Sequence, residues 1–105
     1  MIKISDDITK ITEIISKNFE VNKIILFGSY AKGTENNDSD IDICVLTDEN
    51  IRKIELLRAI RKLLYDYISK PIDLLIYKTD EFYERSNNIK SIEREIENEG
   101  IFIYG

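Results

Sequence analysis

Two aspartates separated by a single residue are the feature of this chain that most directly suggests catalysis. Asp40 and Asp42 stand at the beginning of residues 40–47, where apolar and polar side chains alternate in a period of two, as along a β-strand. Residues two apart on a strand project from the same face, with Cα atoms roughly 6 to 7 Å apart. Because two anions aimed from an otherwise apolar strand are costly unless cations meet them, the pair predicts a metal site.

The ligand types available decide which metal such a site would hold. The chain contains no histidine, which excludes imidazole general bases, His-containing triads and His-ligated zinc or iron. Carboxylate oxygens without a histidine or thiolate partner select Mg²⁺ or Mn²⁺. A two-metal site, with ions ~4 Å apart, needs carboxylates that converge as this pair does.

A third carboxylate, Asp73, is placed to join the pair. It is the only polar residue of 72–76, an otherwise apolar segment that follows Pro71 and is predicted to be a strand. A right-handed crossover from strand 40–47 would lay this strand parallel to the first, so that both acidic sites lie near one end of the sheet. The same crossover could seat the strand further away, and the sequence leaves both positions open.

A glycine–serine pair upstream supplies the other half of a possible site. Gly28 ends a short apolar strand, and glycine at a strand end lets a phosphate approach the backbone. Ser29 begins a short helical turn whose free N–H groups favour anions, and Gly33 permits the tight turn that follows. An anion cradle together with metal-binding carboxylates is the minimum equipment for handling a nucleoside triphosphate.

The elements that position these residues alternate between helix and strand, which predicts an α/β domain with at least one parallel crossover. Apolar spacing and turn residues place their bounds. The predicted elements are a helix capped by Asp6 or Asp7, strand 23–28, a helical turn from Ser29, strand 40–47, helix 51–69, strand 72–77, a helical turn from Thr79 or Asp80, helix 88–99 and strand 101–104. Gly100 is expected to end the last helix as a left-handed cap.

Length and charge limit the kinds of partner. With 105 residues the chain is expected to form a single domain, residues 1–105, so a large substrate would be held by a partner or by a second copy. The 15 basic and 20 acidic residues give a net charge of −5, which disfavours binding to nucleic acid or to anionic lipid. An acidic protein can still bind a nucleotide if metal ions neutralise the site.

The single cysteine and the short apolar runs bear on the cellular compartment of the protein. Cys44 cannot form an internal disulfide, which suits a reducing compartment, and it is expected to be a small core residue. No apolar run approaches the ~20 residues of a membrane span, and the N-terminal residues lack the regions of a signal peptide. We therefore expect a soluble, cytoplasmic protein.

One motif resembles the signature of a known family. It consists of Gly28-Ser29-Tyr30-Ala31-Lys32-Gly33, then Asp38-Ser39-Asp40-Ile41-Asp42, with the lone Asp73 later in the chain. This pattern resembles that of the polymerase-β-like nucleotidyltransferase superfamily, and the short length points to its minimal nucleotidyltransferase (MNT) branch. The resemblance extends over nearly the whole chain and implies the polymerase-β-like fold, a small mixed β-sheet flanked by helices.

The resemblance also implies a reaction and a role for each residue. Gly28 and Ser29 would hold the triphosphate of ATP. Asp40 and Asp42 would bind two Mg²⁺ ions, and Asp73 would complete the metal site and help to deprotonate the acceptor hydroxyl. Small members of this branch are commonly paired with HEPN-domain toxins, where they act as antitoxins by transferring AMP to a tyrosine of the toxin.

The sequence leaves other kinds of function open. The chain could be a binding module that neutralises a partner protein by occlusion, with weak or no transfer activity. The intact glycine–serine pair and three aspartates argue against such a module, since it has no physical need for convergent carboxylates. An antibiotic-modifying enzyme or a polymerase needs additional surface for its substrate, and either would require a second chain to supply it.

Overall fold

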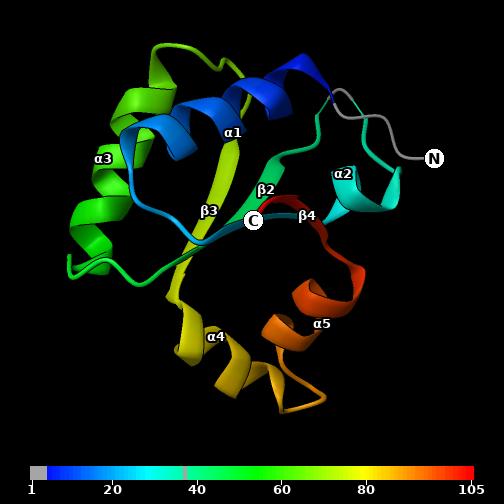
Figure 1. Ribbon diagram of the computed structural model, residues 1–105. Coiled ribbons are helices and arrows are strands. Elements are labelled where there is room, and N and C mark those ends of the chain that lie inside the picture. The colour runs from blue at the N-terminus through cyan, green and yellow to red at the C-terminus, as the bar shows by residue number, and fades with distance from the viewer. Residues whose placement is uncertain (1–4, 37) are drawn as a thin grey trace.

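The protein is built around one mixed four-stranded sheet, here described from a computed structural model over residues 5–36 and 38–105. The strands are β1 (Lys23–Phe27), β2 (Ile41–Thr47), β3 (Ile72–Lys78) and β4 (Ile101–Tyr104), and their order in the sheet is β3-β2-β1-β4 (Figure 1). β1 pairs antiparallel with both β2 and β4, whereas β2 and β3 are parallel. The prediction of a parallel crossover is confirmed, and it seats β3 directly beside β2. Residues 1–4 and Asn37 lie outside the described residues.

Helices α1 (Asp6–Asn18) and α3 (Lys53–Tyr65) cover one face of the sheet (Figure 1). They contribute the apolar residues that recur at helical spacing, and these pack against the inward-facing side of β1 and β2. The larger apolar cluster of the protein is formed in this way, with its fully buried members including Ile8, Ile11, Ile15, Ile24, Ile41, Ile43, Val45 and Ile60.

Helices α4 (Thr79–Ser86) and α5 (Ile92–Glu99) lie on the opposite face. The cluster beneath them is smaller, and its buried members are Ile25, Cys44, Leu46, Phe82 and Ile96. The alternation of β2 therefore separates its side chains as predicted, because Ile43 and Val45 enter the first cluster and Cys44 enters the second. Cys44 is fully buried, and burial raises the pKa of its thiol to about 12, as befits a core residue.

Three predicted helix limits differ from those of the structure. Ser5, rather than Asp6 or Asp7, caps α1, because its hydroxyl accepts a hydrogen bond from the Ile8 N–H at 3.3 Å. The helix predicted over 51–69 is shorter, since α3 gives way to a turn in which the Leu64 carbonyl accepts from the N–H groups of residues 67 and 68. The last helix, predicted from 88, begins after Ser91, whose hydroxyl caps it.

Gly100 ends α5, but not in the left-handed conformation that was predicted. Its φ of −72° is one that any residue adopts. A Cβ atom at this position would instead lie 2.4 Å from the Ile96 carbonyl oxygen and 2.6 Å from the Ile25 Cγ2. Glycine is therefore needed because the chain passes so close to α5 and β1.

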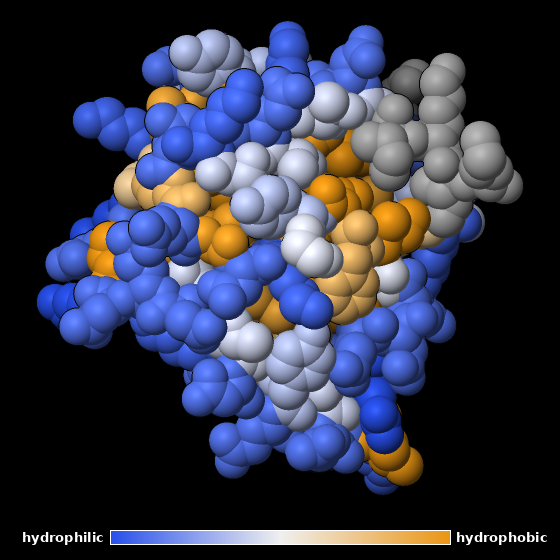
Figure 2. All heavy atoms as spheres, viewed as in Figure 1, coloured by the Kyte–Doolittle hydropathy of each residue, from blue (hydrophilic) through white to orange (hydrophobic). Residues whose placement is uncertain are grey.

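The face of the molecule shown in Figure 2 is largely polar. Hydrophilic side chains cover most of the face shown in Figure 2, with apolar side chains visible between them. Within the described ranges, the helices are too short or too polar to cross a lipid bilayer.

Candidate active site

The sheet brings Asp42 and Asp73 side by side. In the strand register, Asp42 of β2 faces Phe27 of β1 on one side and Asp73 of β3 on the other. Both aspartates lie on the side of the sheet that α4 and α5 cover, since Cys44 belongs to the cluster on that side and Leu75 packs against it. Two carboxylates that are distant in the sequence thus meet near the beginning of two parallel strands.

Gly28 closes the site on the β1 side. It joins β1 to the short helix α2 (Ser29–Lys32) with a φ of 72°, which favours glycine. A Cβ atom on Gly28 would lie only 2.0 Å from the Asp42 Oδ2. The Asp42 carboxylate therefore occupies the space that any side chain at position 28 would need, and this close contact requires glycine.

Helix α2 is fixed to this glycine by its own backbone. The Gly28 carbonyl accepts hydrogen bonds from the N–H groups of Ala31 and Lys32, both at 3.1 Å. Gly33 ends the helix with a φ of 73°, so the tight turn predicted at this position is confirmed. Ser29 is partly buried at the first position of α2, next to the contact between Gly28 and Asp42.

The electrostatics of the pair are unfavourable without a cation. Partial burial, the charge of Asp73, a hydrogen bond between the two carboxyls and the charge of Asp40 together raise the pKa of Asp42 to about 6. A cation bound here would relieve this repulsion and favour the ionised form of both side chains.

Asp40 stands apart from the other two. It is exposed and immediately precedes β2, which begins one residue later than predicted. Over the described ranges, no three side chains of the types that bind metals gather closely enough to surround an ion. The structure therefore unites Asp42 and Asp73 and leaves Asp40 at the rim, and ligation of metal by all three remains a prediction.

This donor set nevertheless fits Mg²⁺. The ion prefers oxygen ligands and retains several waters, and it is usually held by one or two carboxylates together with the phosphates of a substrate. Asp42 and Asp73 supply two such carboxylates, and their mutual repulsion is the condition that a divalent cation removes.

Two further contacts made by residues of α2 were not predicted. Lys32 of α2 forms ion pairs with Glu95 and Glu99 of α5. Lys70, three residues before Asp73, donates a hydrogen bond of 2.7 Å to the hydroxyl of Tyr30, which is otherwise buried. The position of Lys32 one turn after Gly28 was a signal that could have been used, whereas the Lys70 contact joins residues too distant in the sequence to be inferred.

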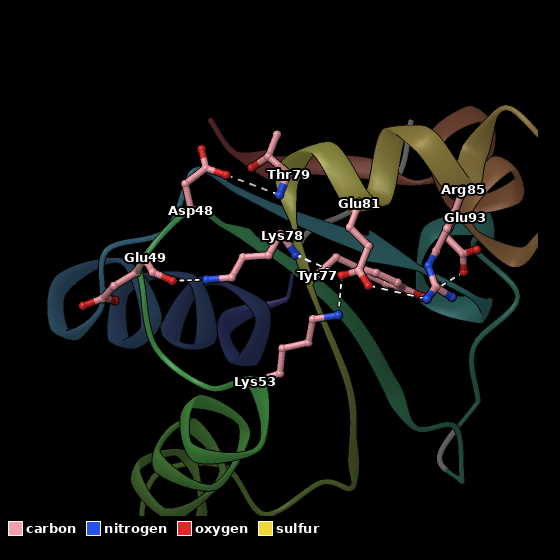
Figure 3. A network of polar contacts seen from close by, with 9 residues as sticks. All are labelled: Asp48, Glu49, Lys53, Tyr77, Lys78, Thr79, Glu81, Arg85 and Glu93. Atoms are coloured by element: carbon pink, nitrogen blue, oxygen red, sulfur yellow. Dashed lines mark hydrogen bonds and ion pairs between the residues drawn. The ribbon is translucent and has the colours of Figure 1, made fainter.

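A separate polar network lies at the other end of β3 (Figure 3). Glu81 of α4 accepts hydrogen bonds from Lys53, from the Lys78 N–H and from Arg85. Nearby, the Tyr77 hydroxyl donates a hydrogen bond of 2.8 Å to the buried carboxylate of Glu93. These contacts fasten α4 and α5 to the sheet and lie at the opposite end of β3 from Asp73.

The sequence is similar to known proteins along most of its length. A family model described as polymerase beta, nucleotidyltransferase matches residues 9–105. A protein of Methanocaldococcus jannaschii, provisionally named a protein adenylyltransferase, is 38% identical over 76 residues, which cover 65% of this chain and 76% of the relative. A second protein of this organism with the same provisional name is 32% identical over 101 residues, covering 96% of this chain and 95% of the relative.

Solved structures with the same fold include chains of toxin–antitoxin complexes. One, from a toxin–antitoxin complex with AMP-PNP, has a TM-score of 0.65 and 24% identity, covering 96% of this chain and 74% of that one. Another, from a complex of tri-AMPylated Shewanella oneidensis HEPN toxin with MNT antitoxin, has a TM-score of 0.57 and 21% identity, covering 94% and 70%. At these identities the likeness concerns the fold.

Proposed function

The chain belongs to the polymerase-β nucleotidyltransferase family, and on this premise we propose that it transfers AMP from ATP to a hydroxyl group of a protein. The observation that carries the proposal is the meeting of Asp42 and Asp73 beside Gly28. An anionic substrate and its cation need partners of opposite charge, and this arrangement offers the N–H groups at the start of α2 for the substrate and paired carboxylates for the cation. The family matches are consistent with this reaction.

Each residue of the site has a role in the proposal. Gly28 and Ser29 receive the triphosphate, since α2 begins there and the first N–H groups of a helix have no partner within it. Asp42 and Asp73, together with Asp40 at the rim, would hold two Mg²⁺ ions. When bound, these ions would supply positive charge to the reacting phosphate and to the leaving group.

The transfer itself exchanges one phosphorus–oxygen bond for another. The acceptor hydroxyl oxygen forms a bond to the α-phosphorus, and the bond from that phosphorus to the bridging oxygen breaks, so that pyrophosphate leaves with the electron pair. Asp73 accepts the hydroxyl proton, because it is the exposed member of the carboxylate pair and can reach an acceptor held outside the sheet. The protein otherwise positions groups and stabilises charge.

The proposed acceptor is a tyrosine of a HEPN-domain toxin, so that the chain acts as the antitoxin of the pair. Support comes from the solved neighbours, which include an MNT antitoxin bound to an AMPylated HEPN toxin. A chain of this size has little surface with which to hold a large substrate. A partner protein that carries the acceptor hydroxyl would supply the rest of the binding surface.

The test is transfer of label from [α-³²P]ATP, with Mg²⁺, to the protein encoded beside this one. Wild type should label the partner, and the Asp40→Asn/Asp42→Asn variant and addition of EDTA should each abolish the label. Asp66→Asn removes an exposed carboxyl at the end of α3 and serves as the matched control. If the double variant neutralised its partner as fully as wild type, with no label in either case, the chain would act by occlusion and the proposal would be wrong.

A further inference from the structure

β3 forms one edge of the sheet, and α3 lies beside it (Figure 1). Natural proteins usually shorten, bend or charge an edge strand, because its unpaired backbone groups can pair with another chain. β3 is seven residues long, and its register with β2 runs without a bulge. Pro71 precedes the strand and Lys78 ends it, but the side chains between them on the α3 side are apolar. The outer edge of β3 is therefore suited to receiving a further strand.

The register of β3 shows which of its backbone groups point outward. The Ile41 N–H of β2 donates to the Pro71 carbonyl at 2.9 Å. Along a parallel pair, alternate residues turn both their N–H and their C=O toward the same neighbour, and the residues between them turn both groups away from it. Lys78 belongs to the outward series, and its N–H already donates to the Glu81 carboxylate. The other outward groups belong to Ile72, Leu74 and Ile76.

A groove runs between this edge and α3. One cavity of about 660 Å³ lies between the C-terminal part of α3 and the first half of β3, and another of about 320 Å³ lies between the start of α3 and the second half. Leu74 lines both cavities, so together they form one groove along the strand, which we call the β3 groove. Its apolar lining includes Ile54 and Leu57 of α3 and the outward-bonding Ile72, Leu74 and Ile76 of β3.

The β3 groove is positively charged at one end. Arg61 and Lys70 line it near the start of β3. Arg61 is exposed and has no ion-pair partner among the described residues, and Lys70 donates to a neutral tyrosine hydroxyl. At the other end, Lys53 is engaged by Glu81. An acidic side chain entering beside Arg61 would therefore meet positive charge that the protein leaves unneutralised, although its net charge is −5.

We propose that the β3 groove binds an extended segment of another protein, which adds a strand to β3 and places an acidic side chain beside Arg61 and Lys70. The outward backbone groups would supply the affinity, and alternate side chains of the segment would enter the groove. A second copy of this chain is a poorer occupant. Its edge strand β4 contains no acidic residue, and Asp73 of its β3 lies on the side away from α3.

The probe is a synthetic peptide in which isoleucine alternates with threonine and glutamate occupies both ends. Titrated into the full chain at low salt, it should shift the amide resonances of Ile72, Leu74 and Ile76 and slow their hydrogen exchange, because their N–H groups become bonded. Two further peptides carry N-methyl groups on every second amide, one on the isoleucines and one on the threonines. One of the two should fail to bind, since its methyl groups block the new ladder.

A change of charge on both sides tests the acidic end of the segment. Arg61→Glu should raise the Kd for the glutamate-ended peptide about fivefold, as expected when a weak attraction at an exposed site becomes a repulsion. A lysine-ended peptide should show the reverse order and bind Arg61→Glu more tightly than wild type. Lys10→Glu makes the same change at an exposed position of α1 and should leave both Kd values as they are in wild type.

The possible outcomes decide the inference without reference to catalysis, because the titration contains neither nucleotide nor metal. If the peptide left the three β3 amides unchanged, or if both N-methylated peptides bound as well as the parent, no strand would be added and the inference would be wrong. Equal affinity for the glutamate-ended and lysine-ended peptides would contradict the preference for an acidic segment. If the same amides shifted with protein concentration alone, a second copy would be the occupant, which also contradicts the inference.

Discussion

At the scale of single residues, Asp42 has the most consequential environment in the site. Its carboxylate is partly buried, contacts the space above Gly28 and faces a second carboxylate, so the folded protein favours its neutral form. The unfolded chain places no such restriction on it. Its ionisation therefore opposes folding, and a group retained at this cost is expected to serve binding or catalysis.

The stability of the metal-free protein should reveal this opposition. Between the ordinary pKa of 3.8 and the folded value of about 6, the folded chain holds a proton that the unfolded chain has released, so the free energy of unfolding falls as pH rises. Asp42→Asn removes the effect. In EDTA at pH 7.5 it should raise the free energy of unfolding by about 1 kcal/mol, after allowance for solvent screening.

Urea unfolding at two pH values checks this prediction. At pH 4, where the unfolded Asp42 also begins to take up a proton, the variant and wild type should differ much less than at pH 7.5. Asp66→Asn is the control for loss of a carboxyl elsewhere. An equal difference between Asp42→Asn and wild type at both pH values would show that Asp42 does not titrate as described.

The site residues were predictable from the sequence to different degrees. Asp42 and Gly28 could be found because their types and spacing are chemically unusual in apolar strands. Whether Asp73 lies close to Asp42 depended on the position of β3 in the sheet, which the sequence left open. The parallel pairing of β2 with β3 places the two aspartates opposite each other. The ion pairs of Lys32 depend on how α5 packs, and no local pattern specifies that packing.

At the scale of elements, two glycines act for different physical reasons. Gly33 ends α2 with a positive φ and has open space around it, whereas Gly100 has an ordinary φ but no room for a Cβ atom. The turn predicted at Gly33 is confirmed, whereas the left-handed conformation predicted for Gly100 is wrong. A glycine after a helix signals its end, but the sequence does not tell whether conformation or close packing requires it.

Substitution by alanine should separate these two reasons. Gly33→Ala should lower the free energy of unfolding by about 1 kcal/mol, the usual cost of a left-handed conformation for a residue with a Cβ atom. Gly100→Ala should cost more, about 2 to 4 kcal/mol, because it forces α5 away from β1. Thermal unfolding of both variants would measure the difference, and equal losses would contradict this account of Gly100.

The alternation of elements was predictable because it depends on local periodicity. The period of two in β2 and the helical spacing in α1 and α3 each indicate one buried face, and the structure buries those faces. Helix limits were less accurate, since capping by Ser5 or Ser91 depends on which of several polar residues the backbone reaches first.

At the scale of the whole molecule, the two faces of the sheet differ in how much apolar surface they bury. The cluster beneath α1 and α3 is the larger, and that beneath α4 and α5 depends on few fully buried side chains, chiefly Phe82 and Ile96. Stability is therefore unevenly distributed, and the side of the sheet that carries the candidate site is the weaker one.

Native-state hydrogen exchange should show this inequality directly. Amides of α4 and α5 should exchange through a partial opening at lower free energy than those of α1, α3 and the central strands. Phe82→Leu, which reduces the smaller cluster, should speed exchange in α4 and α5 with much less effect on α1. If the amides of both helical layers were equally protected, and Phe82→Leu lowered the protection of both layers together, the protein would instead unfold as a single cooperative unit.

The pairing of β2 with β3 has a consequence for folding fidelity. The strands are aligned from Ile41 opposite Ile72 to Thr47 opposite Lys78, and this alignment leaves Asp73 exposed and Leu74 buried. A slip of one residue would exchange the two faces, driving a carboxylate into the apolar layer and a leucine out of it. The charge of Asp73 thus destabilises a misaligned sheet relative to the native one. The same charge that the site requires therefore helps to select the correct pairing of β2 with β3.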